Sequence, residues 1–157
     1  METTIQFVLN GKPVRLSADP NQKLLWILRT EFGLTGTKYG CAAGYCGSCT
    51  VLLNKEAVRS CQITLQDVEK KEIVTIEGLA KNGNLHPLQK AFIKNDALQC
   101  GYCTPGMILN ALGLLYHNQN PSRSEILREM KNNLCRCGSY NRIIDAIETA
   151  AQEMREG

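Results

Sequence analysis

Residues 40–49 read Gly-Cys-Ala-Ala-Gly-Tyr-Cys-Gly-Ser-Cys, and Cys61 follows after 11 further residues. The spacing Cys-x4-Cys-x2-Cys is typical of a plant-type [2Fe–2S] loop. Three thiolates from one loop must converge on the inorganic core, and the interleaved glycines allow the backbone to approach it closely. The loop lacks the lysine and the helix start of a phosphate-binding loop. The motif therefore predicts one four-thiolate metal site, made of Cys41, Cys46, Cys49 and Cys61.

The residues around this loop indicate a small sheet crossed by one helix. Apolar and polar residues alternate on both sides of Asn10-Gly11, a pair that favours a tight hairpin turn. The expected elements are a hairpin over 3–16, a helix over about 22–32 and strands over 50–53, up to Cys61 and over 73–76. The order strand, strand, helix, strand, strand is that of a β-grasp domain, which we assign to residues 1–77.

A second set of four cysteines lies in the C-terminal half, where the apolar spacing becomes helical. After a polar linker at 78–84, four helices are expected within residues 85–157. Two cysteines fall between the first and second helices and two between the third and fourth. Two helical hairpins placed face to face would bring these loops together. The pattern therefore predicts a second four-thiolate site, made of Cys100, Cys103, Cys135 and Cys137.

The helical spacing also predicts the core of this second part. Thr104 is expected to cap its helix, with Pro105 at the first helical position. The side chains expected to point inward are Met107, Ile108, Ala111, Leu112, Leu115, Ile126, Leu127, Met130, Ile143, Ile144, Ile147, Ala150, Ala151 and Met154.

Composition excludes several other classes of protein. Hydrophobic residues make up 43% of the 157-residue chain and charged residues 21%, as in an ordinary globular protein. No apolar run approaches the ~20 residues that span a bilayer. The formal net charge is +3, to which eight ligating thiolates add eight negative charges and two oxidised [2Fe–2S] cores return four positive ones. The resulting charge of about −1 does not indicate a nucleic-acid partner.

The cysteines allow two readings other than iron–sulfur clusters. Four disulfides are disfavoured because the acidic, polar start of the chain contains no signal peptide and no twin arginine, which predicts a reducing, cytoplasmic location. Zinc remains open for the second set, since four thiolates bind zinc equally well and the spacing Cys-x2-Cys…Cys-x-Cys does not distinguish the two metals.

Three ordered motifs carry a resemblance to a known family. Residues 40–49, residues 99–105 (Gln-Cys-Gly-Tyr-Cys-Thr-Pro) and residues 133–137 (Asn-Leu-Cys-Arg-Cys) resemble the small iron–sulfur subunit of molybdenum hydroxylases. This family includes relatives of xanthine dehydrogenase, aldehyde oxidase and carbon monoxide dehydrogenase. The likeness extends from about residue 3 to residue 150. It implies an α+β protein with a plant-type, ferredoxin-like β-grasp domain followed by an all-α four-helix [2Fe–2S] domain.

The resemblance also implies roles for individual residues. The first cysteine set matches the ligands of the flavin-side cluster, and the second set matches those of the cluster nearest the molybdopterin. Gln99 and Cys137 match positions beside the molybdopterin of a large partner subunit. No residue of this chain is then expected to contact the substrate, so the sequence does not distinguish purines, aldehydes, nitrogen heterocycles or carbon monoxide.

The implied function is that of an electron-transfer subunit. Single electrons would pass from the molybdenum centre through two [2Fe–2S] clusters to a medium, FAD-binding subunit within a higher hetero-oligomer. The chain reads Gly138-Ser139-Tyr140 where many members read Thr-Gly-Tyr. This variant is similar to isoquinoline-oxidising and some aldehyde-oxidising branches, some of which pass electrons to cytochromes. A cytochrome-linked two-subunit hydroxylase, a free-standing two-cluster ferredoxin and a zinc scaffold are the alternatives.

Overall fold

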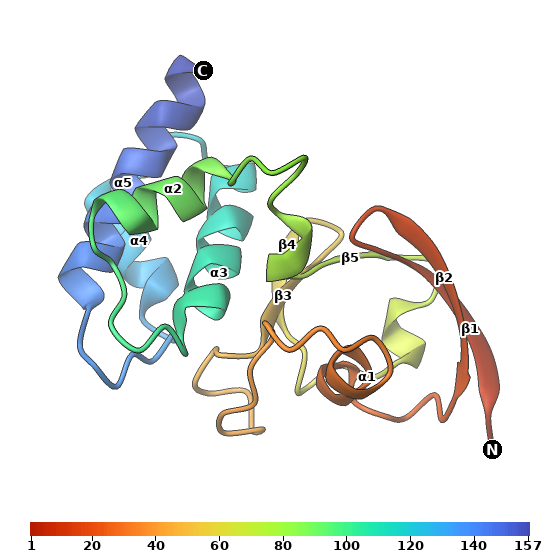
Figure 1. Ribbon diagram of the computed structural model, residues 1–157. Helices are drawn as coiled ribbons and strands as arrows, with labels where there is room; N and C mark the ends of the chain where they lie inside the picture. The colour runs from red at the N-terminus through yellow and green to blue at the C-terminus, as the bar shows by residue number, and fades with distance from the viewer.

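The computed structural model describes residues 1–157 and consists of a five-stranded sheet with one helix, followed by four helices packed together (Figure 1). The first part contains β1 (Thr3–Leu9), β2 (Lys12–Ala18), α1 (Leu24–Thr30), β3 (Thr50–Leu53), β4 (Glu56–Arg59) and β5 (Glu72–Val74). The second part contains α2 (Pro87–Lys94), α3 (Thr104–His117), α4 (Arg123–Met130) and α5 (Tyr140–Glu156). The predicted α+β architecture, a β-grasp domain followed by a four-helix domain, is confirmed.

The sheet forms because β1 presents one apolar face to the core. Its order is β2-β1-β5-β3-β4, with β1 and β5 parallel and the other pairs antiparallel. Ile5, Phe7 and Leu9 are buried on that face. The Phe7 and Phe32 rings pack edge to face, with 6.1 Å between their centroids. Aromatic pairs in this geometry add to the stability that apolar burial provides. The hairpin turns at Asn10-Gly11, as predicted, with positive φ at both residues.

Three predicted elements are shorter than expected, the first being the return strand β4, which ends at Arg59 rather than at Cys61. The first helix covers Leu24–Thr30 rather than 22–32, and the chain reverses just beyond it, where Gly33 has a φ of +63°. The last strand ends at Val74 rather than at residue 76. The side chain of Asn10 accepts a hydrogen bond from the Thr75 N–H at 2.8 Å and donates one to the Thr75 hydroxyl at 2.9 Å. The Asn10 side chain therefore satisfies the Thr75 N–H, which in a longer strand would bond to a neighbouring strand.

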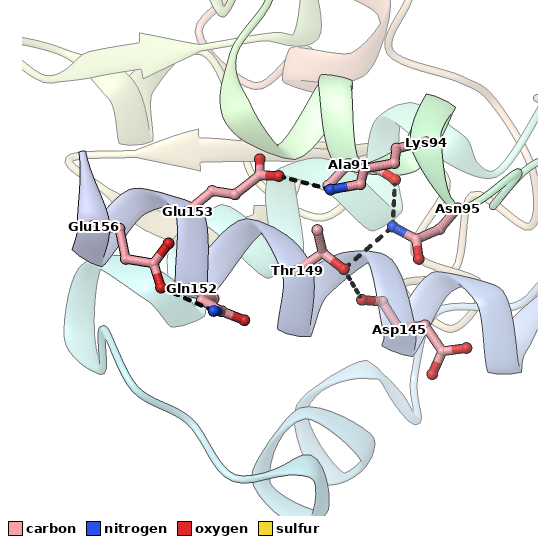
Figure 2. Close-up of polar contacts among 8 residues, drawn as sticks. All are labelled: Ala91, Lys94, Asn95, Asp145, Thr149, Gln152, Glu153 and Glu156. Atoms are coloured by element: carbon pink, nitrogen blue, oxygen red, sulfur yellow. Dashed lines mark hydrogen bonds and ion pairs between the residues drawn. The ribbon is translucent and has the colours of Figure 1, made fainter.

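The helical domain is held by a buried core and by polar contacts at its edge. Figure 2 shows the polar contacts between α2 and α5, where Lys94 pairs with Glu153 at 3.3 Å. The side-chain amide of Asn95 donates to the Ala91 carbonyl at 2.8 Å and to the Thr149 hydroxyl at 3.3 Å. Surface pairs of this kind contribute little energy, so the buried apolar side chains account for most of the stability.

Three predictions about the helices are wrong. Thr104 is the first residue of α3 and Cys103 precedes it, with no side-chain cap. Leu127 is 51% exposed because it lies about 100° around α4 from its buried neighbour Ile126. Met154 is 36% exposed because the last turns of α5 extend past the other helices (Figure 1). The other side chains that were expected to point inward are buried.

The two parts share one core. A single cluster of 31 buried residues includes Ile5 of β1, Leu52 of β3 and Leu112 of α3. α3 packs against β3 and β4, so the helical domain rests on one side of the sheet (Figure 1). The proposed boundaries at residues 77 and 84 therefore stay a prediction. None of the helices is long and apolar enough to cross a membrane.

Two glycines of α3 face the β-grasp domain and provide a test of this interface. A Cβ at Gly106 would lie 2.3 Å from the carbonyl oxygen of Gly47, whereas one at Gly113 would lie 3.0 Å from the Ala57 Cβ. We expect Gly106→Ala to destabilise the protein by about 1–3 kcal/mol, since backbone must move. Gly113→Ala should stay within about 1 kcal/mol of wild type, because alanine favours the helix. Urea unfolding at equal iron content measures both, and equal stabilities for the two variants would contradict this packing.

Candidate iron–sulfur centres

The eight cysteines lie in loops at one end of the molecule (Figure 1). One loop joins α1 to β3, another joins α2 to α3, and a third joins α4 to α5; Cys61 follows β4. All eight are free thiols. The structure thus brings together the loops that the two predicted sites require.

The first loop folds around the sulfur of Cys41. The backbone N–H groups of Ala43, Tyr45 and Cys46 each donate to the Cys41 Sγ at 3.3 Å. These hydrogen bonds lower the pKa of Cys41 to about 6, the bond from Cys46 having the largest effect. Cys41 is therefore a thiolate at neutral pH, which is the form that binds a metal.

Backbone conformation explains why glycines alternate with cysteines in this loop. Gly44 and Gly47 have φ values of +82° and +76°, a region that L side chains rarely adopt. At Gly40 the reason is steric, because a Cβ there would lie only 2.7 Å from the Cys46 Sγ. The glycines thus let the backbone of the loop pass close to the sulfur of Cys46.

The other two cysteines of the first set are buried beside each other. Cys49 and Cys61 pack with Leu25 below the loop. Burial raises the pKa of Cys49 to about 11, and the neighbouring Cys61 thiol adds to this effect. The side-chain amide of Gln62 lies 3.3 Å from the Cys61 sulfur and can donate a hydrogen bond to it. The first set thus has an outer pair, the exposed Cys41 with the half-buried Cys46, and a buried pair, Cys49 with Cys61.

The second set is also arranged as two pairs. Cys103 lies beside Cys135, and burial together with this neighbouring thiol raises the pKa of Cys103 to about 12. Cys100 lies beside Cys137, and both are exposed. The Tyr102 N–H and then this Cys137 contact lower the pKa of Cys100.

Two helix starts lie next to the second set. Cys103 directly precedes α3, and Ser139 directly precedes α5. Burial acts to raise the pKa of Cys135, but the N–H of Ser139, 3.5 Å from its sulfur, and the Cys103 thiol outweigh burial and lower it. Free N–H groups at helix starts favour a negatively charged group.

The paired arrangement fits a two-iron core. Each iron of a [2Fe–2S] cluster takes two cysteine thiolates, so the ligands stand in two pairs around the core. No group of three or more His, Cys, Asp or Glu side chains converges where it could hold a single metal ion. The thiolate donors and the N–H groups directed at them suit an anionic iron–sulfur core.

A buried polar network joins the two cysteine sets. The N–H of Leu134, next to Cys135, donates to the carbonyl of Cys46 at 2.8 Å. The side chain of Asn133 is buried and donates to the Gly47 carbonyl at 3.4 Å. Its Oδ1 accepts hydrogen bonds from Asn110 at 2.8 Å and from Arg59 at 3.3 Å. Asn110 and Arg59 are functional residues that were not predicted, although the polar Asn110 within an apolar helix stripe could have indicated such a role.

The structure also brings Gln99 and Cys137 together. The Gln99 side-chain amide donates to the Cys137 carbonyl at 3.4 Å, and both residues are exposed at the end of the molecule that carries the cysteines. Their predicted position beside a molybdopterin requires an exposed surface of this kind.

Comparisons with known proteins agree with this reading. Residues 7–80 match the family model of a 2Fe-2S iron-sulfur cluster binding domain, and residues 75–148 match that of a [2Fe-2S] binding domain. The chain is 46% identical to a nicotinate dehydrogenase subunit of Pseudomonas putida, covering 99% of both chains. It is 48% identical to the alpha subunit of isoquinoline 1-oxidoreductase of Brevundimonas diminuta, covering 95% of this chain and 98% of that one.

Solved structures show the same similarity. A chain of quinoline 2-oxidoreductase from Pseudomonas putida 86 superposes with a TM-score of 0.93 at 43% identity, covering 99% of this chain and 98% of that one. The aldehyde oxidoreductase of Desulfovibrio desulfuricans superposes with a TM-score of 0.94 at 42% identity, and there this chain covers only 17% of the longer chain. The likeness is thus to a whole small subunit in one enzyme and to one part of a long chain in the other. The chain belongs to the family of small iron–sulfur subunits of molybdenum hydroxylases, which carry two [2Fe–2S] clusters and serve in electron transfer.

Proposed function

We propose that this chain conducts single electrons from a molybdenum centre on a large partner subunit through its two [2Fe–2S] clusters in series. Each cluster supplies a site that takes up and releases one electron. The second set, Cys100, Cys103, Cys135 and Cys137, holds the cluster that is reduced first. The first set, Cys41, Cys46, Cys49 and Cys61, holds the cluster that passes the electron on.

The observation that carries this proposal is the contact between the two cysteine sets. Leu134 is covalently next to the ligand Cys135, and its N–H donates to the carbonyl of the ligand Cys46 at 2.8 Å. A ligand of one cluster is therefore linked to a ligand of the other through one residue and one hydrogen bond. Asn133 holds this contact in place from inside the protein, since its amide also donates to Gly47.

Exposure at the two ends of this route supports a direction. Cys100 and Cys137 are exposed beside Gln99, where a large subunit can bring its molybdopterin close. Cys41 is exposed in the other loop, next to the 80% exposed Tyr45, where an acceptor can approach. The N–H groups directed at Cys41 and Cys135 stabilise the negative charge that each site gains on reduction.

The proposed assembly is a cytoplasmic hetero-oligomer in which a large subunit binds molybdopterin and a medium subunit binds FAD. A cytochrome in place of the FAD subunit is the second candidate acceptor, which the Gly138-Ser139-Tyr140 variant favours. The names of similar subunits, nicotinate dehydrogenase and isoquinoline 1-oxidoreductase among them, favour a nitrogen heterocycle as the substrate of the large subunit. A free-standing ferredoxin is not favoured, because these relatives are subunits of larger oxidoreductases.

Metal analysis tests the ligand assignment. Wild-type protein should contain about four iron and four acid-labile sulfide per chain and almost no zinc, as two [2Fe–2S] sites require. Cys46→Ser should halve the iron content and loosen the β-grasp domain, because metal binding contributes to folding. Cys100→Ser is the matched variant and should remove the other cluster. Retention of both clusters by Cys46→Ser, or stoichiometric zinc in the wild type, would show the assignment to be wrong.

Removing the cluster of the helical domain tests the order of transfer. In the assembled enzyme, Cys103→Ala should leave substrate reduction of the molybdenum centre intact in a single turnover. Steady-state turnover with an acceptor that draws from the far cluster should fall by at least about 100-fold. Stopped-flow absorbance measures both steps, and the variant must still co-purify with a large subunit that contains molybdopterin. Reduction of the remaining cluster at the wild-type rate would refute a series arrangement.

A further inference from the structure

Ser139 is a buried serine whose hydroxyl has no partner in the protein. The residue is 5% exposed, and its Oγ is fully enclosed without a hydrogen bond. Serine at the residue before a helix ordinarily accepts a hydrogen bond from the first turn. Ser122 does this before α4, accepting from the Glu125 N–H at 3.3 Å. Ser139 precedes α5 and makes no such bond.

Backbone conformation accounts for the difference between the two serines. Ser122 is extended, with φ −68° and ψ 156°, which directs its hydroxyl toward the helix start. Ser139 has φ −73° and ψ 16° and therefore holds its side chain differently. A buried hydroxyl without a partner is costly to the folded protein, because it has given up its hydrogen bonds to water. The position of Ser139 next to the second cysteine set offers a partner that would remove this cost.

The turn over residues 135–140 surrounds the sulfur of Cys135. The Ser139 N–H lies 3.5 Å from the Cys135 Sγ, and the Cys135 N–H donates to the Tyr140 hydroxyl at 2.7 Å. The Ser139 Oγ is only two carbon atoms away from that N–H. It is therefore within reach of the sulfur atoms that the second site holds.

A second buried hydroxyl lies beside the same site. Thr104 directly follows Cys103, and its Oγ1 is also enclosed without a partner. Thr37 is the third such residue, but it belongs to the β-grasp domain, outside the loops of the second set. Two of the three unpartnered buried hydroxyls thus lie within two residues of proposed ligands of the second cluster. The sulfur atoms of that cluster would be acceptors for them.

We infer that the Ser139 hydroxyl donates a hydrogen bond to a bridging sulfide of the second cluster, and so raises the reduction potential of that cluster. The inference rests on the proposed ligand set. Reduction adds one electron and negative charge to the site, while the hydroxyl keeps its proton. A hydrogen bond to sulfur stabilises the more negative, reduced form more strongly. Ser139 would thereby favour transfer from the molybdenum side into this chain.

The test is a redox titration of the assembled complex, followed by electron paramagnetic resonance. Ser139→Ala should weaken electron uptake by the second cluster about tenfold, which is ~59 mV for a one-electron couple. Ser139→Thr, which keeps the hydroxyl, should retain the wild-type potential. Thr37→Val is the matched control, since it removes a buried, unpartnered hydroxyl elsewhere. It should leave the second cluster unchanged, and the first cluster should not respond to Ser139→Ala.

Deuterium exchange provides a measurement that does not depend on the potential. An exchangeable proton coupled to the second cluster should be present in the wild type and in Ser139→Thr, and absent in Ser139→Ala. An unchanged potential together with unchanged proton couplings in Ser139→Ala, at full iron content, would overturn the inference. Fewer than two [2Fe–2S] clusters in the wild type would instead contradict the proposed function, so the two failures are distinguishable.

Discussion

The contact between the loop of residues 40–49 and the turn before Cys135 is the constraint on which the rest of the structure depends. The Leu134 N–H donates to the Cys46 carbonyl at 2.8 Å, and the buried Asn133 side chain donates to the neighbouring Gly47 carbonyl. Gly106 allows the first turn of α3 to lie directly on the same backbone. Because each domain contributes its cysteine loop to this junction, the two cofactor sites cannot separate without breaking a buried polar network. The shared core positions the sites relative to each other.

Both sites combine thiols of opposite character. In the first, N–H donors lower the pKa of the exposed Cys41 to about 6, while burial raises that of Cys49 to about 11. In the second, hydrogen bonds lower the pKa of Cys100, while burial raises that of Cys103 to about 12. Metal binding to the buried thiols must release protons that they hold firmly in the apoprotein. Each site exists only in the folded chain, so binding of the irons adds to the free energy of unfolding by whatever exceeds the cost of releasing those protons.

Much of this arrangement could be predicted from the sequence, because cysteine spacing and apolar periodicity are local signals. The loop of residues 40–49 indicated its cofactor, and the helical spacing placed Cys100 and Cys103 opposite Cys135 and Cys137. Contacts between distant segments could not be predicted in this way. Arg59 and Asn110 gain their roles only when β4 and α3 meet Asn133. The prediction that Thr104 caps α3 was wrong because Cys103 is the residue that precedes the helix. The Thr104 hydroxyl has no hydrogen-bond partner.

In this proposal, the two clusters sit on contacting loops and exchange electrons directly. Electron paramagnetic resonance of the fully reduced wild-type protein tests this most directly, because two nearby unpaired spins alter each other's signals. We expect each cluster's signal to be split or broadened by the other, and this interaction to disappear when either cluster is removed. Two signals that simply add, and that are unchanged when the other cluster is missing, would contradict it.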